Sequence, residues 1–137
     1  MEVETMRPIT LFVLAVLFVA STVLTADALF VTATSEDTIA APGNRQPNYI
    51  IASVTDGNGA PISGLTAANF KVDAMIVGPG GALVDISRVA EGRLPGFYFI
   101  DVVPIRQETW KSGTYIFGIA VQKGGDKGQA MAKVLMD

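Results

Sequence analysis

The chain has 137 residues, with 10 basic and 13 acidic side chains, and it contains no histidine and no cysteine. These absences exclude Ser-His-Asp and Cys-His nucleophilic sites, thiolate chemistry, disulfides and ordinary zinc sites, so we expect no enzyme and no cofactor. The formal net charge of −3 leaves no basic stripe of the kind that nucleic-acid binding uses.

An uncharged apolar run near the start of the chain, Ile9 to Ala20, is followed by small residues at Ala26 and Ala28. An apolar segment that ends in a small-x-small site is typical of an export signal. We therefore predict a signal peptide over residues 1–28, cleaved after Ala28, and an exported product in the periplasm, on the cell surface or outside the cell. Residues 29–137 then have room for one domain.

Two alternatives stay open for this segment. The stretch from Pro8 to Ala26 is close to the ~20 residues that span a bilayer, and Arg7 on its flank favours an inside N-terminus, so an uncleaved membrane anchor is the competing interpretation. A buried core helix fits least well. Glu2 and Glu4 make the head of the signal acidic, whereas a start at Met6 would give the basic head that export signals have.

The rest of the chain alternates between short hydrophobic runs with period two and turns rich in glycine and proline. A single helical turn is expected at Thr66–Asn69, with Thr66 as its cap. Turns are expected at Asp56–Gly59, Gly78–Gly81, Glu91–Gly96 and Lys123–Gly128. The predicted strands are Leu29–Thr34, Asn48–Thr55, Phe70–Val77, Leu83–Val89, Phe97–Val103, Thr114–Gln122 and Gln129–Met136. About seven strands at this spacing predict an all-β sandwich.

Three segments carry a family resemblance. Residues 54–70 resemble the V-x-D-x-x-G-x-P-V-x-G-L-T-x-x-x-F pattern of exported bacterial immunoglobulin-like domains, including macroglobulin-like and invasin-type repeats. Residues 96–102 and 113–117 resemble the G-x-Y-x-φ strand starts of the same domains. The resemblance implies an immunoglobulin-like β-sandwich in which Tyr115 forms a tyrosine corner. Without cysteine, and with Phe117 where antibody domains have their second Cys, the domain is not of the antibody type.

Acidic side chains give two candidate sites. Asp56, Asn58 and Asp126 are oxygen ligands on loops, and Asp56–Gly59 begins like a calcium loop, but the downstream glutamate is missing, so we interpret the segment as a turn. The second candidate is formed by Asp73, Asp85 and Asp101 on three different strands. Two of them within ~5–9.5 Å could act on a glycoside, although solvated strand faces are the favoured interpretation.

Trp110 is flanked by Arg106 and Lys111. It could be an exposed ring that stacks on a sugar or packs on a partner, or it could cap one end of the core, which we favour. The functional prediction is a non-enzymatic exported structural or interaction module at the cell envelope. Its loops or its edge strands, Leu29–Thr34 and Gln129–Met136, would receive a protein partner by strand addition. The alternative is a carbohydrate-binding or accessory module that uses Trp110, Tyr98 and the aromatic residues of the loops.

Overall fold

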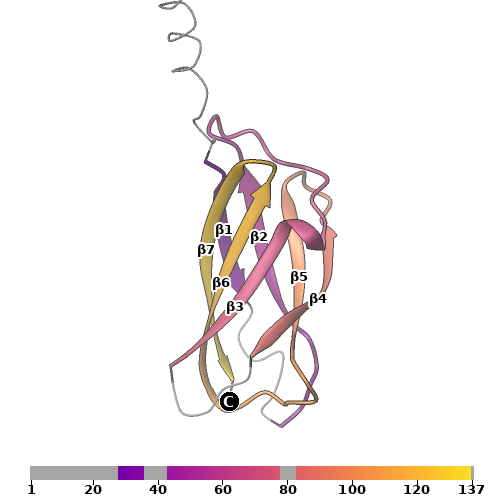
Figure 1. The fold of residues 1–137 in the computed structure, drawn as a ribbon, viewed down its shortest axis with the longest axis vertical. Coiled ribbons are helices and arrows are strands. Elements are labelled where there is room, and N and C mark those ends of the chain that lie inside the picture. Colours follow the sequence, from indigo (N-terminus) through magenta and orange to yellow (C-terminus); the bar gives the residue numbers. More distant parts are fainter. Residues whose placement is uncertain (1–27, 36–42, 78–82, 137) are drawn as a thin grey trace, which may run out of the picture.

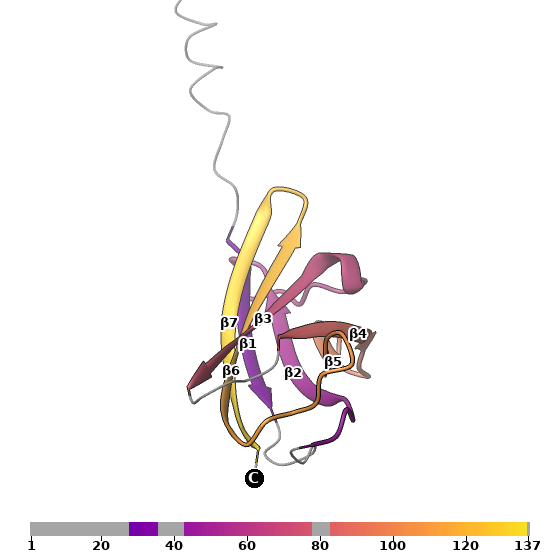
Figure 2. The ribbon, with the colours of Figure 1, turned by 60° about the horizontal axis from the view of Figure 1, so that its bottom comes forward.

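The computed structural model describes residues 28–35, 43–77 and 83–136. Its strands are β1 (Phe30–Ser35), β2 (Asn48–Thr55), β3 (Phe70–Val77), β4 (Val84–Glu91), β5 (Phe97–Pro104), β6 (Gly113–Lys123) and β7 (Asp126–Met136). They form two antiparallel sheets with the orders β1-β2-β5-β4 and β3-β6-β7, packed as two layers (Figure 1 and Figure 2). The order matches the ABED and CFG sheets of a constant-type immunoglobulin sandwich. The predicted sandwich of about seven strands is confirmed.

Most of the predicted strands are found with small changes at their ends. The bounds of β2 and β3 are those predicted, and the helical turn at Thr66 is a 3-10 turn, η1 (Ala67–Asn69). The Asn69 side-chain oxygen accepts a hydrogen bond of 2.8 Å from the Thr66 N–H, which fixes the start of this turn. The predicted signal peptide and the predicted turn at Gly78–Gly81 lie outside the described residues, except for Ala28 at the end of the former.

The predicted hairpin loop at Lys123–Gly128 is wrong in its length. Lys123 pairs with Asp126, and Gln122 pairs with Lys127, so only Gly124 and Gly125 lie between β6 and β7. Polar side chains continue a ladder as readily as apolar ones when they point into solvent. The turn itself needs a positive φ, which Gly124 supplies with a value of 60°.

The core lies between the two sheets and follows the period of two. In β2 and its neighbour β5 every second side chain is buried, and the same alternation in β6 of the other sheet supplies the facing layer. The largest fully buried side chains include Ile50, Tyr98, Ile100, Trp110, Tyr115 and Phe117. Without a disulfide, this apolar layer and its hydrogen-bonded aromatic residues hold the two sheets together.

The predicted tyrosine corner is confirmed. Tyr115 is fully buried near the start of β6. Its hydroxyl accepts a hydrogen bond of 2.9 Å from the N–H of Lys111, four residues upstream. The bond fixes the loop that leads into β6 and satisfies the one polar atom of a buried ring.

The predicted edge strands, β1 and β7, are edges of their sheets, and they lie side by side along one flank of the sandwich (Figure 1). A parallel bridge joins Ala28 to Lys127, and the Leu29 N–H donates to the Lys127 carbonyl at 2.9 Å. The Leu29 backbone also rests directly on Gly128, which has no side chain to block this approach. At this end the two edges therefore cover each other.

Candidate functional site

Trp110 belongs to the core and offers no surface for a ligand. Its side chain is 0 % exposed, and its ring packs edge-on against Tyr115 and Phe117, with centroids 5.4 and 6.3 Å away. The indole Nε1–H donates to the Gln46 carbonyl at 2.7 Å. The interpretation of Trp110 as an exposed stacking ring is therefore wrong, and its role as a core residue is confirmed.

The segment before β2 is what covers Trp110. The Trp110 carbonyl accepts from the Gly43 N–H at 2.8 Å, and the Trp110 N–H donates to the Asn44 carbonyl at 2.9 Å. Arg45 donates from its guanidinium to the carbonyls of Glu108 and Pro104. Two segments far apart in the sequence thus enclose the indole ring, which explains why the sequence near Trp110 does not reveal its burial.

Tyr98 is also buried, with its hydroxyl held by two backbone groups. It donates to the Ile62 carbonyl at 2.6 Å and accepts from the Leu65 N–H at 3.2 Å. Burial raises the pKa of Tyr98 above its usual 10.0, the bond from Leu65 opposes this shift, and the nearby Glu91 carboxylate reinforces it. Tyr98 is therefore a neutral structural residue, and its predicted place in an interaction surface is wrong.

Arg106 and Lys111, the other two predicted interaction residues, are exposed. Arg106 and Gln107 have positive φ angles of 52° and 66°, and the Glu108 N–H closes their turn onto the Ile105 carbonyl at 2.9 Å. The Arg45 guanidinium, which binds carbonyls on both sides of this turn, holds it in place. The two cations remain on the surface, but no exposed aromatic ring lies between them at position 110.

The three candidate carboxylates are not gathered on one sheet, and the Asp56 loop is a turn. The Asp56 Oδ1 accepts from the N–H groups of Asn58 and Ala60 at 2.8 and 3.0 Å, so it closes a turn as expected. Asp73 lies on the three-stranded sheet, whereas Asp85 and Asp101 lie on the other sheet. Over residues 28–35, 43–77 and 83–136, no group of three or more acidic side chains could hold a metal ion.

Glu91 at the end of β4 ties two loops together. One carboxylate oxygen accepts from the Gly64 N–H at 3.1 Å, and the other accepts from the Gly96 N–H at 3.2 Å. These two bonds, with a third from the Ser63 side chain, hold the pKa of Glu91 below its usual value of 4.5 against a weaker opposing effect of burial. The fold therefore favours the ionised form of this side chain.

We expect the ionisation of Glu91 to make the stability of the folded chain fall at acidic pH. Because its pKa is lower in the folded chain, its contribution is complete above the pKa of the unfolded chain and disappears as the pH falls through the folded pKa. Glu91→Gln should therefore lower the melting temperature at neutral pH, with a difference from the wild type that closes well below pH 4.5. Glu108→Gln, at another exposed glutamate, is the control. Thermal melts whose difference stays constant into acid would contradict the assignment.

The surface feature that the sequence reasoning missed lies on the outer face of the four-stranded sheet. Phe97 and Phe99 of β5 are each 40 % exposed. Ile51 of β2 pairs with Phe99, and the Tyr49 ring meets Phe99 edge-on with centroids 6.4 Å apart. We call these four residues the aromatic patch. The signal was present in the sequence, since two phenylalanines flank Tyr98 at alternate positions and must point away from it.

The aromatic patch is built on a rigid part of the molecule. Its residues come from β2 and β5, the two central strands of their sheet, whose opposite faces supply Ile50, Tyr98 and Ile100 to the core. Phe99 also packs over Gly92, where a side chain would come within 3.1 Å of the ring. The Phe99 ring is therefore held between Tyr49 and Gly92.

Comparison with protein-family models, curated proteins and solved structures finds no significant match to this chain. Among the residues that the structure describes, no helix is long and apolar enough to cross a membrane.

Proposed function

We propose that the chain is a non-enzymatic interaction module, exported to the cell envelope, that holds a protein partner on the aromatic patch. The observation that carries the proposal is the pair Phe97 and Phe99, large apolar side chains that remain 40 % exposed on a rigid sheet. Aromatic residues are enriched in protein interfaces and dominate their energetics. Covering the exposed part of each ring would contribute roughly 1–2 kcal/mol to binding.

The patch is a better docking surface than the edge strands. Strand addition needs unpaired backbone groups, and at one end of the flank the Leu29 N–H and the Lys127 carbonyl already bind each other. The patch needs no rearrangement before a partner binds. The apolar run and the small residues Ala26 and Ala28 support the proposed export. The lack of histidine and cysteine supports a role without enzymatic activity.

The carbohydrate-binding alternative loses the two aromatic residues that it named, because Trp110 and Tyr98 are both buried.

The proposal is tested by removing the exposed rings while keeping the fold. In the source cells, Phe97→Thr combined with Phe99→Thr should leave a chain that folds and is exported but no longer migrates as part of a larger assembly on native gels of envelope fractions. Threonine suits a strand, and both positions face outward. Leu83→Ser, which removes another exposed apolar side chain (61 %), is the matched control and should keep the assembly.

Two results would reject the proposal. One is a double variant that migrates with the same assembly as the wild type, which would show that the rings do not hold the partner. The other is a wild-type chain that stays in the cytoplasm with an intact N-terminus, which would remove the export on which the proposal depends.

A further inference from the structure

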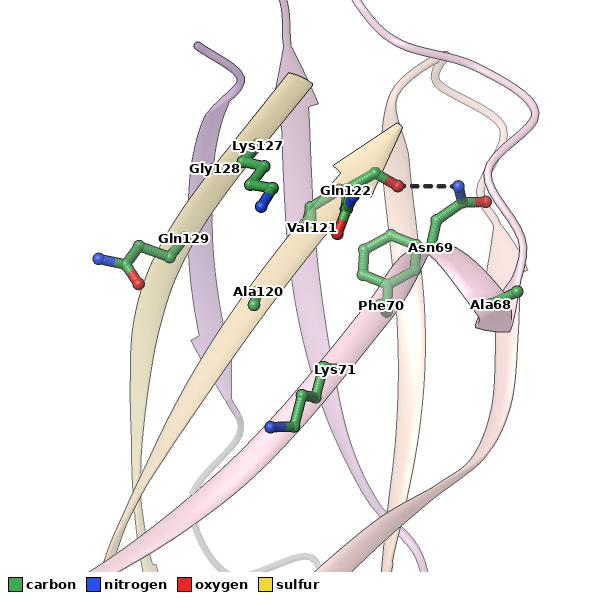
Figure 3. Close-up of a pocket in the computed structure, with 10 residues that line it drawn as sticks. All are labelled: Ala68, Asn69, Phe70, Lys71, Ala120, Val121, Gln122, Lys127, Gly128 and Gln129. Carbon is green, nitrogen blue, oxygen red and sulfur yellow. Dashed lines mark hydrogen bonds between the residues drawn. The ribbon is translucent and has the colours of Figure 1, made fainter. Parts of the chain in front are cut away.

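The outer face of the three-stranded sheet carries a shallow trough, on the opposite side of the sandwich from the aromatic patch. Two adjoining hollows of about 540 and 380 Å³ share Ala120 and Gln129 in their lining. The first is drawn in Figure 3. Together they follow β6, the central strand of this sheet, from Gln122 to Gly118.

The trough exists because β6 has small residues at its outward positions. Tyr115, Phe117, Ile119 and Val121 point into the core, so Gly118 and Ala120 face outward and form the floor. The neighbouring strands raise walls on both sides, since Lys71 and Gln129 flank Ala120 while Asp73 and Met131 flank Gly118. A groove of this kind, which runs parallel to a strand between two rows of side chains, could hold a peptide in an extended conformation.

The two ends of the trough differ in chemistry. Lys127 pairs with Gln122 at one end, and Lys71 pairs with Ala120 in the middle of the trough (Figure 3). At the other end lie Gly118, Asp73 and Met131, the last of which is 69 % exposed. The first end and the middle therefore carry two cations, and the far end offers space above Gly118 beside the apolar Met131 side chain.

The three strands of this sheet carry four lysines and two aspartates, Asp73 and Asp126. Of the five lysines in the chain, four lie on its strands: Lys71, Lys123, Lys127 and Lys133. Asp73 contacts Lys71 at 3.5 Å, but both side chains are largely exposed. An ion pair of this kind contributes little to stability, so the carboxylate of a ligand can replace Asp73 at small cost.

We propose that this trough binds an extended acidic peptide segment, with its carboxylates on Lys71 and Lys127 and an apolar side chain beside Gly118 and Met131. A peptide suits the trough better than an acidic sugar chain. Among the described lining residues the single aromatic ring is Phe70, which is 7 % exposed and offers no face on which a sugar ring could stack. The trough is distinct from the aromatic patch, so the protein would have a docking surface on each sheet.

The test measures the fluorescence anisotropy of a labelled, glutamate-rich peptide ending in leucine, titrated with the full chain. Wild type should bind it saturably, and binding should weaken as salt is added. Lys71→Gln combined with Lys127→Gln should weaken it by about tenfold. Ala120→Phe fills the floor without changing charge and should weaken it similarly. Lys111→Gln, away from the trough, and Phe99→Thr, on the aromatic patch, should bind like the wild type.

The outcomes separate the possible explanations. If the double lysine variant binds as well as Lys111→Gln, or if Ala120→Phe has no effect, the trough is not the binding site. If the wild type binds alginate, an acidic sugar chain, and not the peptide, the ligand class is wrong. Because positions 71, 120 and 127 are exposed, circular dichroism should show an unchanged fold in every variant. A result on Phe97 and Phe99 leaves this proposal untouched, since the two surfaces share no residue.

Discussion

Replacing Trp110 with alanine should lower the free energy of unfolding by about 3–5 kcal/mol. The substitution leaves a large cavity beside Tyr115 and Phe117, the rings that the indole contacts. It also leaves the Gln46 carbonyl without its donor. Since small domains are stable by roughly 5–15 kcal/mol in total, this single change should remove a large part of the stability. Urea unfolding followed by circular dichroism measures it.

Two further variants separate burial from hydrogen bonding. Trp110→Phe keeps an aromatic ring but loses the indole N–H, so it should cost less than alanine, including about 1 kcal/mol for the lost bond to Gln46. Phe99→Ala removes a ring that is partly exposed and should also cost much less. If Trp110→Ala unfolds at the same urea concentration as the wild type, the burial of this residue is refuted.

Gly128→Ala should destabilise the protein by about 2–3 kcal/mol. A methyl group at this position would collide with the Leu29 carbonyl oxygen and lie within 2.9 Å of the Val31 side chain. One obstacle lies just before β1 and the other at its start, and the first is backbone, which cannot rotate away. The expected result is that β1 separates from β7 and loses the bond between Leu29 and Lys127. Urea unfolding measures the cost, and faster amide exchange at Leu29 locates it.

Gly118→Ala is the matched control, because it makes the same chemical change on the neighbouring strand. The nearest atom to its added methyl group is the Asp73 carbonyl oxygen, at an ordinary distance of 3.9 Å. Glycine within a strand costs about 0.5–1 kcal/mol relative to alanine, so this variant should be neutral or slightly more stable. If both alanine variants shift stability equally, the proposed collision at Gly128 is not responsible.

The sequence was sufficient for most of the fold because the strands and turns carry independent signals. In β2 and β3, alternating side chains lie between residues with strong turn preferences, so the bounds could be predicted. The predicted loop before β7 is too long because the polar residues there continue the two strands. In fact Lys127 pairs with Gln122 and continues the ladder.

The site was less predictable, for two physical reasons. In β5 both faces carry apolar side chains. Alternation shows which residues share a face, but it does not show which face is buried. It therefore does not distinguish the buried Tyr98 from the exposed Phe97 and Phe99. Trp110 lies in a loop with no periodicity, and its burial depends on Gln46, far away in the sequence. The trough depends on how β3, β6 and β7 are aligned with one another. The sequence of a single strand does not reveal that alignment.

The contact between β1 and β7 has a consequence for the order of folding. These are the first and last strands of the sandwich, so the flank that they close cannot form until the C-terminal strand has emerged from the ribosome. Pairing between distant segments also makes folding slow. A chain that folds late stays unfolded for longer, which would suit the export proposed above, because an unfolded chain crosses a membrane more easily than a compact one. The architecture thereby delays completion of the sandwich until β7 has been synthesised.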